Sequence, residues 1–250
     1  MEKLSIIVPV YNEAAQLRQV IETLMASYSP IPREWIFVDD CSTDPSLSIL
    51  RSHASRYGYR ILTQEKNLGK GMAVIRGVRE STGDIVMVQD ADFEYDPNEI
   101  PSLLEPILKG EADVVYGSRF KKKTPASRRT CHYFANRLLT ALSNGMSGLH
   151  LTDMETCYKV FRADLLKAMN LKSKRFGIEI EMTAYVTKVR ARLEERPISY
   201  RPRTRLQGKK INWKDGFAAF FHLARFYWFT PLTEAFHEVP PPYSHFPKKF

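Results

Sequence analysis

Short apolar runs, each followed by polar residues, recur through the first half of the chain. These runs are rich in β-branched and aromatic residues and too short for core helices, so they predict buried strands at 4–10, 35–38 and 85–88. Amphipathic stretches between them predict helices over 14–27, 45–57 and 71–80. Strands alternating with helices predict an α/β fold with a Rossmann-like, mainly parallel sheet flanked by helices.

Two carboxylates, Asp90 and Asp92, follow the apolar run at 85–88 directly. Ligands of open α/β sheets bind beyond the carboxyl ends of the strands. Two carboxylates at such a strand end can share a hard divalent cation that also holds a diphosphate. Taken alone, such a triplet is more typical of a solvated turn or a helix cap.

Three other predicted strand or loop ends carry polar residues as well. The first apolar run leads through Pro9 into a polar turn at residues 11–13, and the second is followed by Asp39 and Asp40. Adjacent carboxylates are costly to bury unpaired, so we expect these two to be exposed or occupied by ribose or base donors. The glycines of the loop at 67–71 permit close backbone approach, and its Lys70 could reach a phosphate.

The ordered set of motifs resembles the family 2 glycosyltransferases with the GT-A fold, over roughly residues 4–212. The motifs are Val8-Pro9-Val10-Tyr11-Asn12-Glu13, Asp39-Asp40, Asn67-Leu68-Gly69-Lys70-Gly71, Asp90-Ala91-Asp92 and Gly117-Ser118-Arg119. Within the family, 117–119 and 208–210 look most like the branch that glycosylates polyprenyl phosphates, the dolichol-phosphate mannose synthases and their bacterial relatives. The chain departs from that branch at Glu94, where Gln is frequent, and at 153–159, which lacks the usual glycine-containing motif.

The resemblance implies an enzyme that inverts the anomeric carbon by single displacement, and it implies roles for particular residues. The donor nucleotide would be bound by Pro9, Tyr11, Glu13, Asp39, Asp40, Lys70, Asp90 and Ala91. Mg²⁺ or Mn²⁺ would be held by Asp90, Asp92 and Glu94. The catalytic candidates are Asp92, Arg119, Asp153 and Glu155.

The net charge of +9 is concentrated in the second half of the chain. A basic surface raises the question of nucleic acid, but no recognisable DNA- or RNA-binding module accompanies it. Anionic lipid headgroups or a phosphate acceptor explain it more economically. The residues expected to hold an acceptor phosphate are Arg119, Arg128, Arg129, Arg203, Arg205, Lys209 and Lys210.

The nature of the acceptor decides whether a general base is needed. A lipid phosphate is already anionic at neutral pH and needs no strong base. A sugar hydroxyl must lose its proton, and Asp153 or Glu155 would then be the base. The alternative for both carboxylates is an exposed loop or a salt bridge to the basic cluster.

The segment 213–229 predicts a helix with a basic face and many aromatic residues. Such a helix could lie in the headgroup zone of a membrane, or it could pack in the core or in a homodimer. Residues 238–250, with their proline cluster, are expected to be extended or disordered. We therefore divide the chain into a glycosyltransferase domain, 1–212, with a nucleotide-sugar and metal half at 1–120 and an acceptor half at 121–212, and a tail at 213–250.

Compartment is inferred from three observations. The first strand begins at once, which leaves no room for a signal peptide, and no apolar stretch approaches the roughly 20 residues that span a bilayer. Cys41, Cys131 and Cys157 have no metal-binding spacing and cannot all pair, which favours a reducing compartment. The chain is expected to be cytoplasmic and peripheral on the inner face of the membrane.

Several functions remain open at this stage. The first is transfer of a hexose from a UDP- or GDP-sugar to a polyprenyl phosphate, and the second is transfer to a saccharide or another hydroxyl acceptor. A nucleotidyltransferase would need a glycine-rich phosphate loop after Val10, where 11–13 stands instead. A non-catalytic nucleotide-sugar binding module is disfavoured because both metal carboxylates are present.

Overall fold

The computed structural model describes residues 2–122, 131–175, 177–203 and 213–244. Its strands are β1 (Leu4–Val10), β2 (Arg33–Asp39), β3 (Arg60–Thr63), β4 (Ile85–Val88), β5 (Val114–Ser118), β6 (Lys159–Arg162) and β7 (Leu193–Pro197). Its α-helices are α1 (Ala14–Ala26), α2 (Ser46–Tyr57), α3 (Lys70–Glu80), α4 (Ile100–Leu108), α5 (Cys131–Ser147), α6 (Ala163–Ala168), α7 (Ile178–Lys188), α8 (Trp213–Ala224) and α9 (Leu232–Ala235). Two 3₁₀ turns, η1 (Pro97–Glu99) and η5 (Pro241–Tyr243), and a π-helical turn, η4 (Arg225–Phe229), complete the described elements.

The strands form one seven-stranded sheet in the order β3-β2-β1-β4-β6-β5-β7. Neighbouring strands are parallel except where β6 pairs with β4 and with β5. The sheet is therefore mainly parallel, as the alternation of strands and helices predicted. The strands β1, β2 and β4 lie side by side, so the polar residues that follow them lie at the same edge of the sheet.

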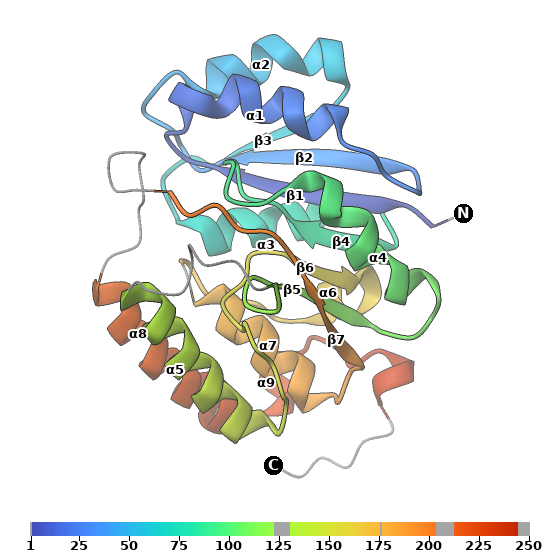
Figure 1. The fold of residues 1–250 in the computed structure, drawn as a ribbon, viewed down its shortest axis with the longest axis vertical. Helices are drawn as coiled ribbons and strands as arrows, with labels where there is room; N and C mark the ends of the chain where they lie inside the picture. The colour runs from blue at the N-terminus through green and yellow to red at the C-terminus, as the bar shows by residue number, and fades with distance from the viewer. Residues whose placement is uncertain (1, 123–130, 176, 204–212, 245–250) are drawn as a thin grey trace.

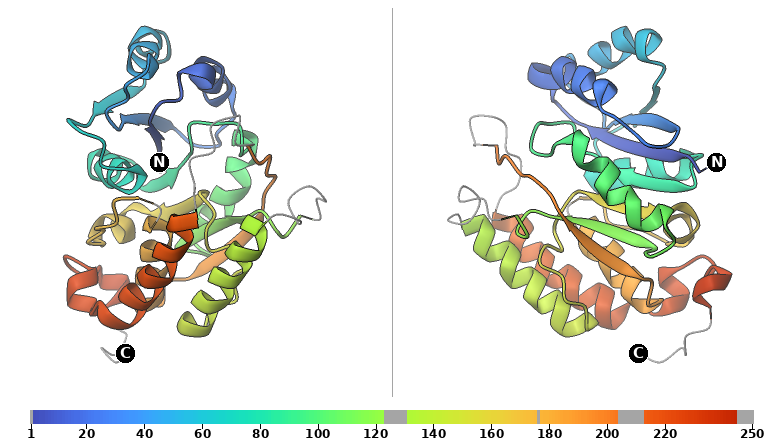
Figure 2. Two further views of the ribbon diagram at one scale, coloured as in Figure 1. Left: turned by 90° about the vertical axis from the view of Figure 1, so that its left-hand side faces the viewer. Right: turned by 45° about the vertical axis from the view of Figure 1, so that its right-hand side comes forward.

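Helices cover the sheet, and two of them form a separate layer beside α7 (Figure 1). α3 packs on β1 and β2, whereas α4 packs on β5, β6 and β7. α5 and α8 lie next to each other at the end of the molecule remote from α1 and α2, and both contact α7 (Figures 1 and 2). The last segments of the chain thus pack on the same body as the sheet.

The predicted elements agree closely with the observed ones in the first half of the chain. The three predicted helices begin and end within one residue of α1, α2 and α3. The predicted tail helix is α8 continued by η4, whose inward residues include Leu223 and Phe226, each 1% exposed. No helix in the described ranges is long and apolar enough to cross a membrane.

The prediction for the last residues is wrong in part. Residues 241–243 form a 3₁₀ turn instead of an extended or disordered segment, and Tyr243 at its end is buried. Proline is common at the first position of such a turn. Burial of the aromatic ring of Tyr243 contributes free energy that stabilises the turn. Residues 245–250 lie outside the described part of the chain.

Candidate active site at the carboxyl ends of the strands

The two carboxylates after β4 lie in the sheet edge formed by β1, β2 and β4. Asp92 is only 5% exposed, and Asp90 is paired with Lys70, whose Nζ lies 2.8 Å from Asp90 Oδ1. Burial opposes ionisation of Asp90, but Lys70 outweighs it and lowers the pKa of that carboxyl. Burial and the neighbouring charge of Asp90 instead raise the pKa of Asp92 to about 7. A cation placed next to Asp92 would therefore interact favourably with these two carboxylates.

Arg203 supplies one such charge from a distant part of the sequence. Its Nη2 lies 2.6 Å from Asp92 Oδ2, and its Nη1 lies 3.1 Å from Glu13 Oε2. The segment that follows β7 brings Arg203 here because the backbone N–H groups of Arg201 and Arg203 donate to Glu94. Arg203, predicted with the acceptor set, thus lies between the proposed donor residue Glu13 and the proposed metal ligand Asp92.

Glu94 connects this segment to the loop after β4. One carboxylate oxygen accepts from the backbone N–H of Arg203 at 2.8 Å, and the other accepts from the Tyr200 hydroxyl at 3.2 Å. Both oxygens of the predicted third metal ligand are therefore hydrogen-bonded within the protein. The described residues contain no group of three or more His, Cys, Asp or Glu side chains arranged to hold a metal ion.

The adjacent carboxylates after β2 have different environments. Asp40 is 2% exposed, and its oxygens accept from the backbone N–H groups of Leu68 and Gly69 and from the Gln64 amide. It therefore differs from the expectation of an exposed or ligand-occupied carboxylate, because the 67–71 loop supplies its donors. Asp39 accepts one bond, from the Ser42 N–H at 3.1 Å, and its buried Oδ1 has no partner among the described residues.

The 67–71 loop has the close backbone approach that its glycines predicted. A Cβ placed on Gly71 would lie 2.0 Å from the Ser173 carbonyl oxygen, and one on Gly69 would lie 2.4 Å from that of Lys174. Gly69 also has φ +89°, which side chains rarely tolerate. The loop can therefore pack tightly on 173–175 while Lys70 reaches the strand ends.

The catalytic candidates of the second half lie in a buried charge cluster. Arg119 forms a bidentate pair with Asp153, with Nε and Nη2 each 2.7 Å from a carboxylate oxygen, and its backbone N–H donates to the same carboxylate. Asp153 is fully buried. It is thus in the salt bridge that the sequence left open as its alternative, and the pairing leaves it poorly placed to take a proton.

Among the described residues, no cation forms a salt bridge with Glu155. Its buried Oε1 has no hydrogen-bond partner in the described part of the structure. Burial and the charge of Glu179 raise the pKa of Glu155 to about 8. Nearby Lys159 donates instead to the Met154 and Thr156 carbonyl oxygens at 2.6 and 2.8 Å, and burial lowers the pKa of its ammonium. A carboxyl with the raised pKa of Glu155 could act as a base near neutral pH.

Comparison with known proteins identifies the family. The profile of glycosyl transferase family 2 matches residues 5–169, well over half of the chain. The chain belongs to glycosyl transferase family 2. This membership confirms the family resemblance predicted from the strand-end motifs, and it favours sugar transfer over nucleotidyl transfer.

The names of several curated relatives of this glycosyltransferase refer to polyprenyl phosphates. A dodecaprenyl-phosphate galacturonate synthase of Rhizobium johnstonii is 30% identical over 68% of the chain and 50% of its own length. An undecaprenyl-phosphate 4-deoxy-4-formamido-L-arabinose transferase of Edwardsiella ictaluri is 32% identical over 66% of the chain, and a dolichol-phosphate mannosyltransferase of Pyrococcus furiosus is 35% identical over 48%. The chain spans about half the length of the first two relatives and about a third of the last.

Solved structures confirm the fold of the glycosyltransferase. The glucosyl-3-phosphoglycerate synthase of Mycobacterium tuberculosis in complex with phosphoglyceric acid superimposes with a TM-score of 0.69 at 21% identity, covering 90% of this chain and 80% of the other. The same synthase with Mn²⁺, UDP-glucose and phosphoglyceric acid gives a TM-score of 0.67. The GT-A prediction is therefore confirmed.

The remaining predicted residues of the glycosyltransferase divide into two groups. Pro9 and Tyr11 are partly buried at the end of β1, and Ala91 is buried between the two predicted metal ligands. The others lie outside the described residues, and these are Arg128, Arg129, Arg205, Lys209 and Lys210.

Sequence reasoning missed two acidic residues in the first turn of α7. Glu179 Oε1 lies 3.2 Å from Lys70 Nζ, and both oxygens of Glu181 accept from the backbone N–H groups of Lys172 and Ser173. The signal was present, since two carboxylates stand in an otherwise apolar stretch, Ile178–Met182. Charged side chains are rarely buried in an apolar stretch unless they have a partner. Here the partners are Lys70 of the glycine loop and the backbone N–H groups of Lys172 and Ser173.

Proposed function

We propose that this family 2 glycosyltransferase moves a hexose from a UDP- or GDP-linked donor to a polyprenyl phosphate, with inversion and with Mg²⁺ or Mn²⁺. The polyprenyl-phosphate acceptors in the names of its curated relatives support this proposal. The observation that carries it is the pairing of Asp153 with Arg119, because this pair removes one of the two predicted bases from proton transfer.

Donor binding is supported by the edge formed by β1 and β2. The unpartnered Asp39 Oδ1 is a buried acceptor, and a buried acceptor without a donor is costly. The N–H of a nucleobase or a ribose hydroxyl would supply that donor. Pro9, Tyr11 and Glu13 at the end of β1 would form the neighbouring wall of the pocket.

The chemistry of the donor set fits a divalent metal at Asp90 and Asp92. Both provide the hard oxygen ligands that Mg²⁺ and Mn²⁺ prefer, and a cation would offset the repulsion that raises the pKa of Asp92. When bound, such a metal stabilises the negative charge that develops on the departing diphosphate. Lys70, which pairs with Asp90, would turn to the diphosphate and orient it for departure.

The acceptor phosphate would attack without losing a proton first. Its second pKa of about 6 leaves it ionised at neutral pH, so positioning and charge neutralisation matter more than base catalysis. Arg203 already lies within the site, and Arg119 lies at the end of β5 with Asp153 holding its guanidinium in place. The other residues predicted to hold the phosphate, Arg128, Arg129, Arg205, Lys209 and Lys210, lie outside the described part of the chain.

Membrane contact is supported by exposed apolar side chains on adjacent helices. α5 exposes Phe134 and Leu138, while α8 and η4 expose Phe220, Phe221, Trp228 and Phe229, the last at 76%. α5 and α8 lie side by side, so these residues can share one surface (Figure 1). Aromatic residues beside basic segments suit the headgroup zone of a membrane. We propose that the enzyme acts as a peripheral protein at the cytoplasmic membrane face.

The membrane proposal is tested by sedimentation with anionic vesicles. The double variant F221S/W228S should bind them several-fold more weakly, whereas the control Y28S, which removes an exposed aromatic from the end after α1, should bind like the parent. Added salt should weaken binding as well. Equal binding by all three proteins would exclude this surface.

The transfer reaction is tested with a panel of labelled UDP- and GDP-sugars, each combined with short polyprenyl phosphates and Mg²⁺ or Mn²⁺. Label should pass into the organic extract for one donor and should require the metal. A label that enters no lipid with any donor, while a saccharide acceptor is glycosylated, would refute the acceptor class.

A hydroxyl acceptor is the second candidate, and Glu155 favours it. Its pKa of about 8 would suit a general base operating near neutral pH. In that case the product would be a cell-surface saccharide, and loss of Glu155 would remove most of the turnover.

A further inference from the structure

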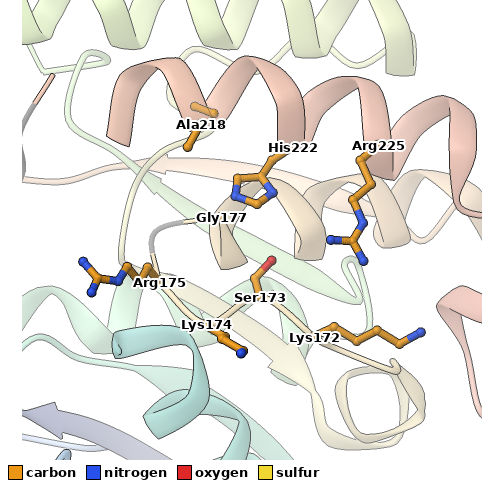
Figure 3. A pocket seen from close by; sticks show the side chains of 9 residues that line it. Lys172, Ser173, Lys174, Arg175, Gly177, Ala218, His222 and Arg225 are labelled. Atoms are coloured by element: carbon orange, nitrogen blue, oxygen red, sulfur yellow. The ribbon is translucent and has the colours of Figure 1, made fainter. Parts of the chain in front are cut away.

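A pocket of about 390 Å³ lies beside α8, between that helix and the segment that precedes α7 (Figure 3). Its lining comprises Lys172, Ser173, Lys174, Arg175, Gly177, Ala218, Ala219, His222 and Arg225. None of the residues proposed for the donor or the metal is among them. The pocket is therefore distinct from the proposed donor and metal site.

The rim of the pocket is positively charged. Four of the nine lining residues are Lys or Arg, and no Asp or Glu is among the lining. Within the described part of the chain, only Lys172 of these four has a carboxylate partner, Glu234 at 2.9 Å. Lys174, Arg175 and Arg225 line the pocket without such a partner among the described residues, and this excess of positive charge favours an anion.

The floor of the pocket contains two unsatisfied polar atoms. Ser173 is 6% exposed, and its hydroxyl has no hydrogen-bond partner among the described residues. The same holds for Nδ1 of His222, which projects from α8 into the pocket. Figure 3 shows the Ser173 hydroxyl pointing toward the space below the His222 ring. Buried polar groups are normally paired, so both atoms indicate a ligand with hydrogen-bonding oxygens.

The backbone at the start of α7 leaves room for this arrangement. A Cβ on Gly177 would lie 2.8 Å from Cδ2 and Nε2 of His222, so only glycine lets the ring lie across this position. Gly177 precedes the eleven-residue helix α7, whose first N–H groups give this end a partial positive charge. Glu179 and Glu181 in the first turn of α7 offset this charge, so the positive charge of the pocket comes from its Lys and Arg side chains.

We propose that this pocket binds a phosphate-bearing ligand at a second anion site, separate from the donor and metal site. A phosphate offers several acceptor oxygens in different directions, which suits a hydroxyl and an imidazole on the floor and guanidinium groups on the rim. The volume exceeds that of a single phosphate, so the phosphate would carry an attached group. The proposal does not depend on which sugar or acceptor the transferase uses.

The phosphate could belong to a lipid headgroup or to a soluble metabolite. The geometry suits a headgroup, because Phe220 and Phe221 are exposed on the same helix as the lining residues Ala219 and His222. In either case the ligand would touch 173–175, the segment on which Gly69 and Gly71 pack. A ligand in the pocket would therefore stabilise segment 173–175, against which the loop that carries Lys70 packs.

The test compares two pocket variants, R225Q and S173A, with the control R51Q, which removes an exposed charge from α2 at the far end of the molecule. Binding is measured without metal or donor, by calorimetry with glycerol 3-phosphate and inorganic phosphate and by sedimentation with phosphatidylcholine vesicles with and without phosphatidic acid. Thermal unfolding in phosphate-free buffer checks that the variants remain folded.

The parent and R51Q should bind at least one of these probes alike, and R225Q should bind it about tenfold more weakly, as expected for one charged hydrogen bond. S173A should weaken binding of the same probe by a smaller factor. Loss confined to the soluble phosphates would identify a metabolite site, and loss confined to phosphatidic acid vesicles a headgroup site. The proposal would be overturned if R225Q, S173A and R51Q bound every probe equally well. It would also be overturned if the parent bound none of the probes.

Discussion

The two halves of the site handle their charges differently. At the ends of β1, β2 and β4, carboxylates are paired with long flexible cations, Lys70 and Arg203, that a ligand could displace. In the second half, Asp153 is held by a bidentate Arg119 and Glu195 by the backbone of Thr152 and Asp153. The first half is thus built to exchange partners, and the second half is built to hold a shape.

This difference assigns separate roles to carboxylates that look alike in the sequence. In our proposal, a metal and a diphosphate replace the protein cations at Asp90 and Asp92. Asp153, although predicted as a catalytic candidate, is paired with Arg119, and we propose that it positions this arginine. If the contrast is correct, substitutions in the first half should reduce turnover with little effect on folding, and those in the second should reduce stability.

The largest effect is expected for Asp92→Asn. The amide keeps the volume but removes a negative charge from the metal site, so turnover should fall by about 10³-fold, or roughly 4 kcal/mol of transition-state stabilisation, with unchanged unfolding. Steady-state kinetics in metal-depleted and Mg²⁺-restored enzyme measure this, with the exposed Glu111→Gln as the control. Full activity of D92N after metal restoration would contradict the metal assignment.

The next effect is expected for Asp153→Asn. It leaves Arg119, whose side chain is only 12% exposed, without a carboxylate, which should cost about 3 kcal/mol of unfolding free energy, measured by urea denaturation. The matched control is Asp113→Asn, which breaks a bidentate pair with the more exposed Arg192 and should cost about 1 kcal/mol or less. Equal costs for the two variants would show that burial of the Arg119 pair is not important.

A smaller effect, on one substrate, is expected for Arg203→Gln. If Arg203 transfers its charge to the acceptor phosphate, the acceptor KM should rise or kcat should fall about 10- to 100-fold, while donor affinity changes little. The exposed neighbour Arg201 provides the control R201Q. A fall in donor affinity as large as the loss in turnover would place Arg203 with the donor instead.

The smallest effect is a pH-dependent gain from Glu155→Gln. The folded-state pKa of about 8 lies above the ordinary value of 4.5, so the wild type loses stability as the pH rises through this interval, and the variant does not. The variant should match the wild type below pH 4.5 and exceed it by about 1 kcal/mol or more at pH 8. Urea unfolding across this range measures the difference, and a constant difference would contradict the raised pKa.

The sequence predicted the donor half well because its information is local. Each strand end there is a short run followed at once by its polar residues, so Asp90, Asp92 and Asp39 could be placed at one edge without knowledge of distant contacts. Asp40 was harder, since its donors come from the 67–71 loop, and two adjacent carboxylates give no sign of which donors each will meet.

The acceptor half could not be predicted to the same depth because its contacts join distant segments. Arg203 reaches Asp92 only through the backbone bonds of 201–203 to Glu94, and Glu179 reaches Lys70 from the start of α7. Charge counting identified a basic region but gave no pairing. The bidentate pair of Arg119 and Asp153 needed the neighbouring ends of β5 and the segment before β6, which only the fold supplies.

The central claim is that an ionised acceptor removes the need for a general base. Its direct test is turnover with saturating donor and metal, using a short polyprenyl phosphate or its unphosphorylated alcohol as acceptor. We predict transfer to the phosphate at least 10²-fold faster than to the alcohol, with the rate on the phosphate little changed in E155Q. Equal rates on the two acceptors, or a collapse of turnover in E155Q, would contradict the account and establish a hydroxyl acceptor.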